Sequence, residues 1–162
     1  MINSLNNQLR CCNRETFKIP FPSVERIYKK CVDSCRRPIL EDPALSPLQK
    51  IKRLLEWFIE FFKSKDYAYG CPIGNLAQEM GDLSPAFREK LRSALDILIN
   101  SYSGVLAQAQ KEGEISQNLD VQEAARFLVS SWHGALMHMK TMKGPEPLEN
   151  HKRFIFDYVL RP

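Results

Sequence analysis

The amino-acid sequence predicts an all-α protein, and three observations support that prediction. Beyond residue 22 the apolar residues recur every three or four positions, which is the spacing of one helix face. Capping residues and prolines stand just before these stripes, where helices commonly begin. No stretch alternates apolar and polar residues as a half-buried strand does, and no internal repeat is evident.

The first two expected helices lie in the N-terminal half of the chain. One begins after residues 21–23 and ends at Pro38, because proline interrupts the hydrogen bonds of a helix. The other begins in residues 46–49, which form a capping box with proline at the first helical position, and ends near Lys65. Its apolar stripe consists of Leu48, Ile51, Leu55, Phe58 and Phe62.

A short helix and a long one are expected next. The short helix covers Pro72–Met80, after a loop at residues 66–70, and Gly81 breaks it. Ser84 caps the following helix, whose apolar stripe continues to Gly113. At the usual rise of an α-helix this element is a rod of roughly 40 Å.

The last two expected helices, residues 121–143 and 148–160, are unusually apolar. The first of them begins in another capping arrangement, residues 120–123. A helix that is apolar over so wide an arc must bury against more than one neighbour. It is either the central helix of a monomer or part of a bundle that two subunits form through residues 121–160. Its apolar residues outside the main stripe are Phe127, Val129, Met137 and Met142.

Length and composition fit one domain, or one domain with a small appendage. The chain has 162 residues, of which 44% are hydrophobic and 26% are charged, so it can bury a substantial core. No run of 18 apolar residues predicts a membrane span, and no secretory signal is visible. Five cysteines without regular spacing do not resemble a disulfide framework, so we expect a cytoplasmic, reducing environment.

The charge is concentrated near the N-terminus. Residues 1–40 contain eight basic and three acidic side chains, whereas the rest of the chain is nearly neutral. A basic end of this kind is typical of contact with an anionic partner, with nucleic acid as the first candidate, or of a soluble tail.

Neither a catalytic site nor a metal site is predicted. His133 and His138 are five residues apart, which excludes a zinc site shared on one helix face. Four cysteines lack the spacing of zinc knuckles, namely Cys11, Cys12, Cys31 and Cys35. A glycine-rich phosphate loop and a Gly-x-Ser-x-Gly elbow are both missing from the sequence. We therefore expect a protein that is not an enzyme and that holds no cofactor.

Cys71 differs from the other cysteines because it immediately precedes the expected helix Pro72–Met80. The exposed N–H groups and the dipole of a helix start favour a thiolate. Two roles are open for this residue. It is either a small packing residue, which is the commoner role, or a thiol that senses oxidants or electrophiles.

Aromatic residues gather on several of the expected helices. An apolar cavity between the helices of a bundle is a common binding site for small molecules, and a filled core is the alternative. The candidate lining of such an effector pocket is Trp57, Phe58, Phe61, Tyr102, Trp132 and His133.

Five segments then occur in an order and spacing that resemble a known family. They are residues 70–79 (GCPIGNLAQE), 82–88 (DLSPAFR), 109–115 (AQKEGEI), 132–137 (WHGALM) and 145–148 (PEPL). Together they are similar to the regulatory domain of TetR/AcrR-type bacterial transcriptional repressors. The resemblance implies a small hydrophobic or electrophilic effector and a four-helix dimer bundle formed by the last two long helices. It also implies covalent sensing by Cys71 with Lys140, as in some members of the family.

The N-terminal region resembles the family only in part. Residues 13–25 are similar to the end of its three-helix DNA-binding unit, but Glu15 replaces a glycine and Pro20 falls where helix is needed. Upstream only residues 1–12 remain, roughly thirty fewer than the two supporting helices require. The resemblance thus implies an incomplete DNA-binding unit, with a remnant that consists of Arg14, Thr16, Phe17, Lys18 and Ser23.

The resemblance implies two regions and a mechanism. Residues 1–22 are expected to be the remnant of the DNA-binding domain, and residues 23–162 the effector-binding and dimerisation domain. An effector would tilt the helix at residues 23–37 and change the spacing of two DNA-binding heads in a homodimer. The alternative is a ligand-binding and dimerisation module without DNA binding of its own, which acts through heterodimers.

Overall fold

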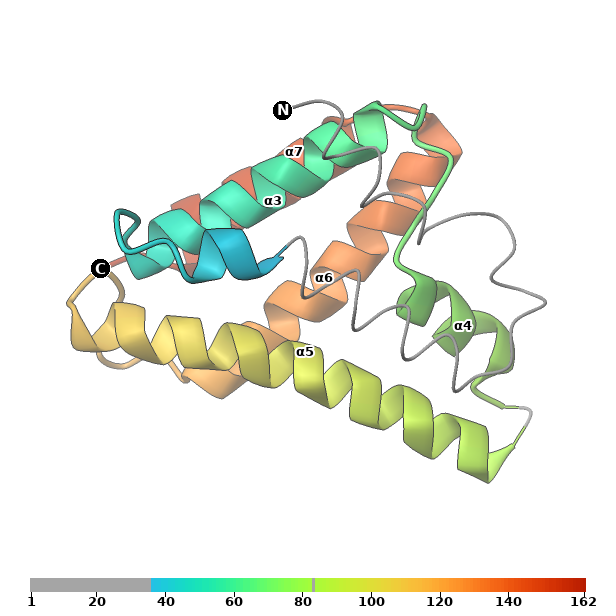
Figure 1. Ribbon diagram of the computed structural model, residues 1–162, viewed down its shortest axis with the longest axis horizontal. Helices are drawn as coiled ribbons and strands as arrows, with labels where there is room; N and C mark the ends of the chain where they lie inside the picture. Colours follow the sequence, from blue (N-terminus) through green and yellow to red (C-terminus); the bar gives the residue numbers. More distant parts are fainter. Residues whose placement is uncertain (1–35, 83) are drawn as a thin grey trace. The chain divides into compact units, whose positions relative to one another are not determined.

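The computed structural model describes residues 36–82 and 84–162 (Figure 1). The chain divides into two compact units, residues 1–43 and 44–162. In the described part of the first unit, residues 36–40 are helical. The positions assigned to a DNA-facing remnant lie outside the described residues; these are Arg14, Thr16, Phe17, Lys18 and Ser23.

The sequence predicts that the first helix ends at Pro38, and this prediction is wrong. Helical backbone continues to Leu40, and the Glu41 N–H donates to the Arg37 carbonyl at 2.9 Å. Proline removes only its own N–H from a helix, so later residues can still bond to earlier carbonyls.

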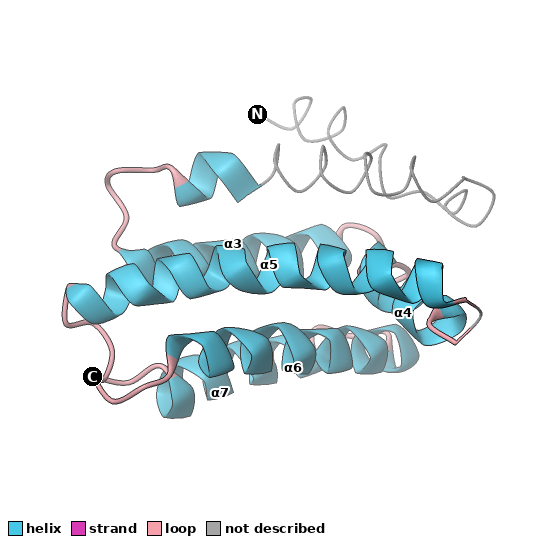
Figure 2. Ribbon diagram, turned by 90° about the horizontal axis from the view of Figure 1, so that it is seen from below, coloured by secondary structure: helices cyan, strands magenta, loops and turns pink. Residues whose placement is uncertain are grey.

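The second unit is all-helical in the part of the chain that is described, which confirms the predicted fold class. Figure 2 shows α3 and α5 in one layer and α6 and α7 in another, and α4 contacts α5. The elements are α3 (Pro47–Lys63), α4 (Pro72–Met80), α5 (Pro85–Lys111), α6 (Val121–Met142), α7 (Glu146–Phe154) and a π-helical turn, η3 (Ile155–Val159).

The helix starts are held by the capping residues expected from the sequence. Ser46 Oγ accepts from the Gln49 N–H, and the Ser46 N–H donates to Gln49 Oε1 at 2.9 Å, which completes the capping box of α3. Ser84 Oγ accepts from the N–H of Phe87 at 3.1 Å and caps α5. The Asp120 carboxylate accepts from two N–H groups in the first turn of α6.

The last helix differs from the prediction at both ends. It begins at Glu146 instead of Leu148, and its final turn is π-helical, with the Leu160 N–H donating to the Ile155 carbonyl at 2.8 Å. The chain then bonds to the loop between α5 and α6, where the Ser116 N–H donates to the Arg161 carbonyl at 2.7 Å. This tertiary hydrogen bond lies beyond the helix and joins the C-terminal residues to the α5–α6 loop.

The core lies between the two layers and is apolar. Its largest fully buried side chains come from α3 to α7, η3 and the α5–α6 loop: Ile51, Leu54, Leu55, Ile73, Leu106, Ile115, Leu128, Met139, Leu148 and Ile155. Burial of each such side chain contributes about 1.5–3 kcal/mol. Among the described residues, no helix has the length and apolar character needed to cross a membrane.

Candidate functional site

The aromatic residues named from the sequence form a ring cluster between α3 and α6. Trp57 stacks on Phe61, with ring centroids 5.7 Å apart and an angle of 4° between the planes. Phe58 meets the edge of Trp57 at 5.1 Å and reaches Trp132 of α6 at 6.3 Å. Phe61 and Trp132 are buried, whereas Trp57 and Phe58 are half-buried. The structure thus brings together four of the residues expected to line an effector pocket.

The two other expected lining residues occupy different positions. Tyr102 is buried on α5. His133 faces α4, where a Cβ added to Gly74 would lie 3.0 Å from His133 Cδ2. Burial lowers the pKa of His133, so the ring is neutral at pH 7. The absence of a side chain at Gly74 permits this close approach of α4 to α6.

Lys140 makes a second contact between α6 and α4, next to Gly70. Lys140 Nζ donates to Asn75 Oδ1 at 3.0 Å. A Cβ added to Gly70 would lie 3.5 Å from Lys140 Cε, so the Lys140 side chain passes next to the residue that precedes Cys71. Cys71 is half-buried and is the N-cap of α4, and no side chain caps this helix. Lys140 therefore lies against Gly70, and the start of α4 lies at the next residue, Cys71.

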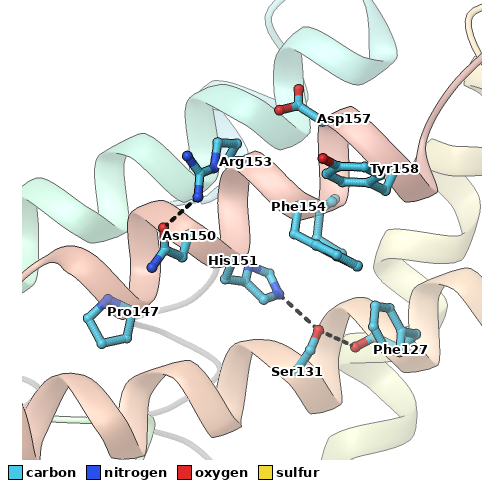
Figure 3. A pocket seen from close by; sticks show the side chains of 10 residues that line it. Phe127, Ser131, Pro147, Asn150, His151, Arg153, Phe154, Asp157 and Tyr158 are labelled. Atoms are coloured by element: carbon cyan, nitrogen blue, oxygen red, sulfur yellow. Dashed lines mark hydrogen bonds between the residues drawn. The ribbon is translucent and has the colours of Figure 1, made fainter.

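A shallow hollow on the outside of α6 and α7 was not predicted from the sequence. It has a volume of about 720 Å³ and lies between the two helices (Figure 3). We call it the outer hollow, and it is lined by Phe127, Ser131, Pro147, Asn150, His151, Arg153, Phe154, Ile155, Asp157 and Tyr158. A second hollow of about 420 Å³ continues along the same helices and includes the exposed His138.

Ser131 and His151 form a hydrogen-bonded pair at the base of the outer hollow. His151 Nε2 lies 2.9 Å from Ser131 Oγ, and the Ser131 hydroxyl donates to the Phe127 carbonyl at 2.6 Å (Figure 3). Because that hydroxyl proton is committed to a carbonyl, Nε2 carries the imidazole proton and Nδ1 is a buried acceptor without a partner. The pair lacks the proton arrangement of an activated serine nucleophile.

His151 also extends the ring cluster toward the outer hollow. Its ring lies 5.2 Å from that of Trp132 in an edge-to-face arrangement. Burial lowers the pKa of His151 to about 4, although a hydrogen bond to the Leu128 carbonyl opposes the shift. A sequence signal existed for this position, because Leu148, His151 and Ile155 share one buried helix face.

The apolar residues outside the main stripe of α6 are mostly exposed. Phe127, Met137 and Met142 are 45–58% exposed, whereas Val129 is buried. Phe154 and Tyr158 of the last helix are 52% and 65% exposed, and their rings stack at 4.9 Å. In the described residues no three His, Cys, Asp or Glu side chains lie where they could hold a metal ion.

Comparison with known proteins finds one matching family and several similar transcriptional regulators. Residues 47–155 match the family described as "Tetracyclin repressor-like, C-terminal domain". The chain is 30% identical over 121 residues to the HTH-type transcriptional repressor DhaR of Mycobacterium sp. strain GP1, covering 75% of this chain and 59% of that protein. It is also 30% identical over 112 residues to the transcriptional regulator AcuR of Cereibacter sphaeroides, covering 69% and 51%. The chain thus spans a little over half the length of these relatives.

Two solved structures resemble the fold. The regulatory protein TetR from Rhodobacter sphaeroides matches with a TM-score of 0.79 and 26% identity, over 84% of this chain and 72% of that one. A TetR transcriptional regulator from Chloroflexus aurantiacus J-10-FL matches with a TM-score of 0.61 and 23% identity, over 88% and 77%. The second likeness concerns the fold alone.

Proposed function

This chain belongs to the TetR family of transcriptional regulators, and from that premise we propose that it is an effector-controlled repressor that acts as a homodimer. Residues 23–162 are assigned to effector binding and dimerisation, and residues 1–22 to the DNA-binding domain. The protein is a cytoplasmic regulator, not an enzyme, and it needs no cofactor. The ring cluster between α3 and α6 supports the proposal most directly.

The proposed effector site comprises the ring cluster, with Tyr102 of α5 and His133 of α6 as further lining residues. Half-buried Trp57 and Phe58 offer aromatic faces to a ligand, and buried Phe61 and Trp132 hold them in place. Such surfaces favour a small apolar molecule. The neutral His133, with Tyr102, completes the proposed site.

Intrinsic fluorescence tests this site directly, because Trp57 and Trp132 are the two tryptophans of the sequence. We expect binding of a small apolar compound from a screened panel to shift this fluorescence, and Phe58→Ala to weaken that binding about tenfold or more. Ile97→Ala is the matched control, because Ile97 is exposed on α5. If Phe58→Ala and Ile97→Ala bind the same compound equally well, the effector site is wrongly placed.

Repression is tested with duplex DNA that flanks the protein's own gene. We expect a mobility shift at physiological salt that weakens as salt rises and that the compound from the fluorescence screen reverses. The second candidate function is a ligand-binding module that acts through heterodimers. Compound binding without any salt-dependent DNA shift would support that candidate instead.

Covalent sensing at Cys71 is a further part of the proposal. The thiolate sulfur would add to an electron-poor alkene, forming one S–C bond while the π electrons and a proton go to the neighbouring carbon. Lys140 would favour the thiolate by its charge. We expect Lys140→Met to slow N-ethylmaleimide labelling of Cys71 several-fold, as measured by peptide mass spectrometry, and exposed Lys143→Met to leave it unchanged. Equal labelling rates in both variants would contradict this role.

A further inference from the structure

Two opposite charges lie one turn apart on the last helix, at the edge of the outer hollow. Arg153 and Asp157 both line this hollow and both are exposed (Figure 3). Arg153 Nη2 donates to Asn150 Oδ1 at 3.0 Å. This hydrogen bond orients the guanidinium, but the amide oxygen is neutral and does not balance the positive charge. Within the described ranges, neither Arg153 nor Asp157 forms an ion pair.

A nearby cation does not neutralise Asp157. Arg161 Nε donates to the backbone carbonyl of Asp157, and the Arg161 guanidinium lies over the Tyr158 ring, 5.2 Å from its centroid. The side-chain carboxylate of Asp157 is therefore available to another cation. The stacked rings of Phe154 and Tyr158 belong to the same two turns as the two charges.

We propose that a second copy of this chain binds with its α7 and η3 antiparallel to those of the first, so that Arg153 of each copy pairs with Asp157 of the partner subunit. This inference rests on the proposed homodimer and adds its register and its basis for partner choice.

The symmetry of a homodimer explains why this register satisfies both charges. Across a two-fold axis the same patch meets itself, so a residue i that contacts j places j against i as well. With the axis between positions 153 and 157, both ion pairs form at once. A register in which the axis passes through either position would bring like charges together, which disfavours that arrangement.

The aromatic residues beside the charges are consistent with the same register. Phe154 and Tyr158 are about half exposed or more in the single chain, and the outer hollow of about 720 Å³ provides room for rings from a second copy. Ion pairs flanked by aromatic rings are partly removed from water, which strengthens them and makes a mismatched partner unfavourable. The pair would therefore select identical copies over related chains that lack this charge order.

Charge reversal tests the register with the full chain. Arg153→Asp and Asp157→Arg each place like charges in both pairs, so each variant alone is expected to weaken the homodimer at least about tenfold. An equimolar mixture of the two variants restores opposite charges in both pairs and is expected to form a heterodimer of wild-type affinity. The double variant R153D/D157R is expected to recover the homodimer. Analytical ultracentrifugation and native mass spectrometry of mass-tagged chains measure these states.

Asp96→Arg is the matched control, because Asp96 is exposed on α5 and does not line the outer hollow. It is expected to dimerise like the wild type. If the wild type dimerises and both single reversals dimerise equally well, or if the mixture fails to form the heterodimer, the register is overturned while the homodimer stands. A monomeric wild type would overturn the homodimer itself.

Discussion

His151 is a polar side chain on the buried face of the last helix, where the helical spacing predicts apolar residues. Its Nε2 bonds to Ser131 at 2.9 Å, whereas its buried Nδ1 has no partner. Protonation would place an N–H donor at that buried nitrogen with nothing to accept it. Burial also removes the charged imidazolium from water, and this desolvation lowers the pKa of His151 to about 4.

We predict that His151 makes the protein less stable in mild acid. Histidine in an unfolded chain has a pKa of about 6.5, so between pH 6.5 and 4 the unfolded chain takes up a proton that the folded chain does not. The stability is therefore present above pH 6.5 and is lost as pH falls. The free energy of unfolding should fall by about 2 kcal/mol between pH 7 and pH 5 through this residue.

Urea unfolding of the wild type and of His151→Leu, at one protein concentration, measures this contribution. His133 also has a lowered pKa, so the informative quantity is the difference between the two pH profiles. The leucine variant should show the shallower loss, because it removes one of the two groups. Parallel profiles would show that His151 is not the group responsible.

At the scale of the helix, the sequence predicts those features that contacts between nearby residues determine. The starts of α3, α5 and α6 were predictable because Ser46, Ser84 and Asp120 bond to backbone within three residues of themselves. The first turn of α3 also binds a carboxylate that no local pattern reveals. The Leu48 N–H donates to Glu114 Oε2 at 2.8 Å, from a loop 66 residues further along the chain.

The π-helical turn escaped prediction for the same reason. Residues 148–160 carry an ordinary helical stripe, so periodicity alone gives no sign of a change in hydrogen bonding at Ile155. The turn is followed at once by the bond from Ser116 to Arg161, which joins segments far apart in sequence. Such end effects depend on tertiary contacts that helix spacing does not encode.

The candidate site shows the same limit, because helix spacing predicts which residues share a face but not which helices lie in contact. Residues 57, 58 and 61 were expected to gather because they lie on adjoining faces of one helix, and Trp132 joins them from α6. The sequence could not show that His133 packs on Gly74, because that contact depends on how closely α4 approaches α6. The outer hollow was missed because it exists only once α6 and α7 are side by side.

Across the described part of the molecule, the exposed large apolar side chains are distributed unevenly. Phe127, Met142, Phe154 and Tyr158 all belong to α6, α7 and η3, and each lines one of the two hollows there. Ile97 on α5 is equally exposed but lines neither of them. A clustered apolar surface of this kind is typical of a protein interface, whereas a single exposed isoleucine is normal.

We therefore predict that thermal stability depends on protein concentration, because a dimer that dissociates on unfolding gains stability by mass action. The Tm of the wild type should rise by several degrees when its concentration is raised about a hundredfold. Phe154→Glu buries a charge in the proposed interface and should abolish that rise, whereas Ile97→Glu should retain it because it changes an equally exposed side chain elsewhere. Differential scanning calorimetry at the two concentrations measures all three proteins. A rise that survives in Phe154→Glu would place the subunit interface away from the last helix, and the proposed homodimer would then need another surface.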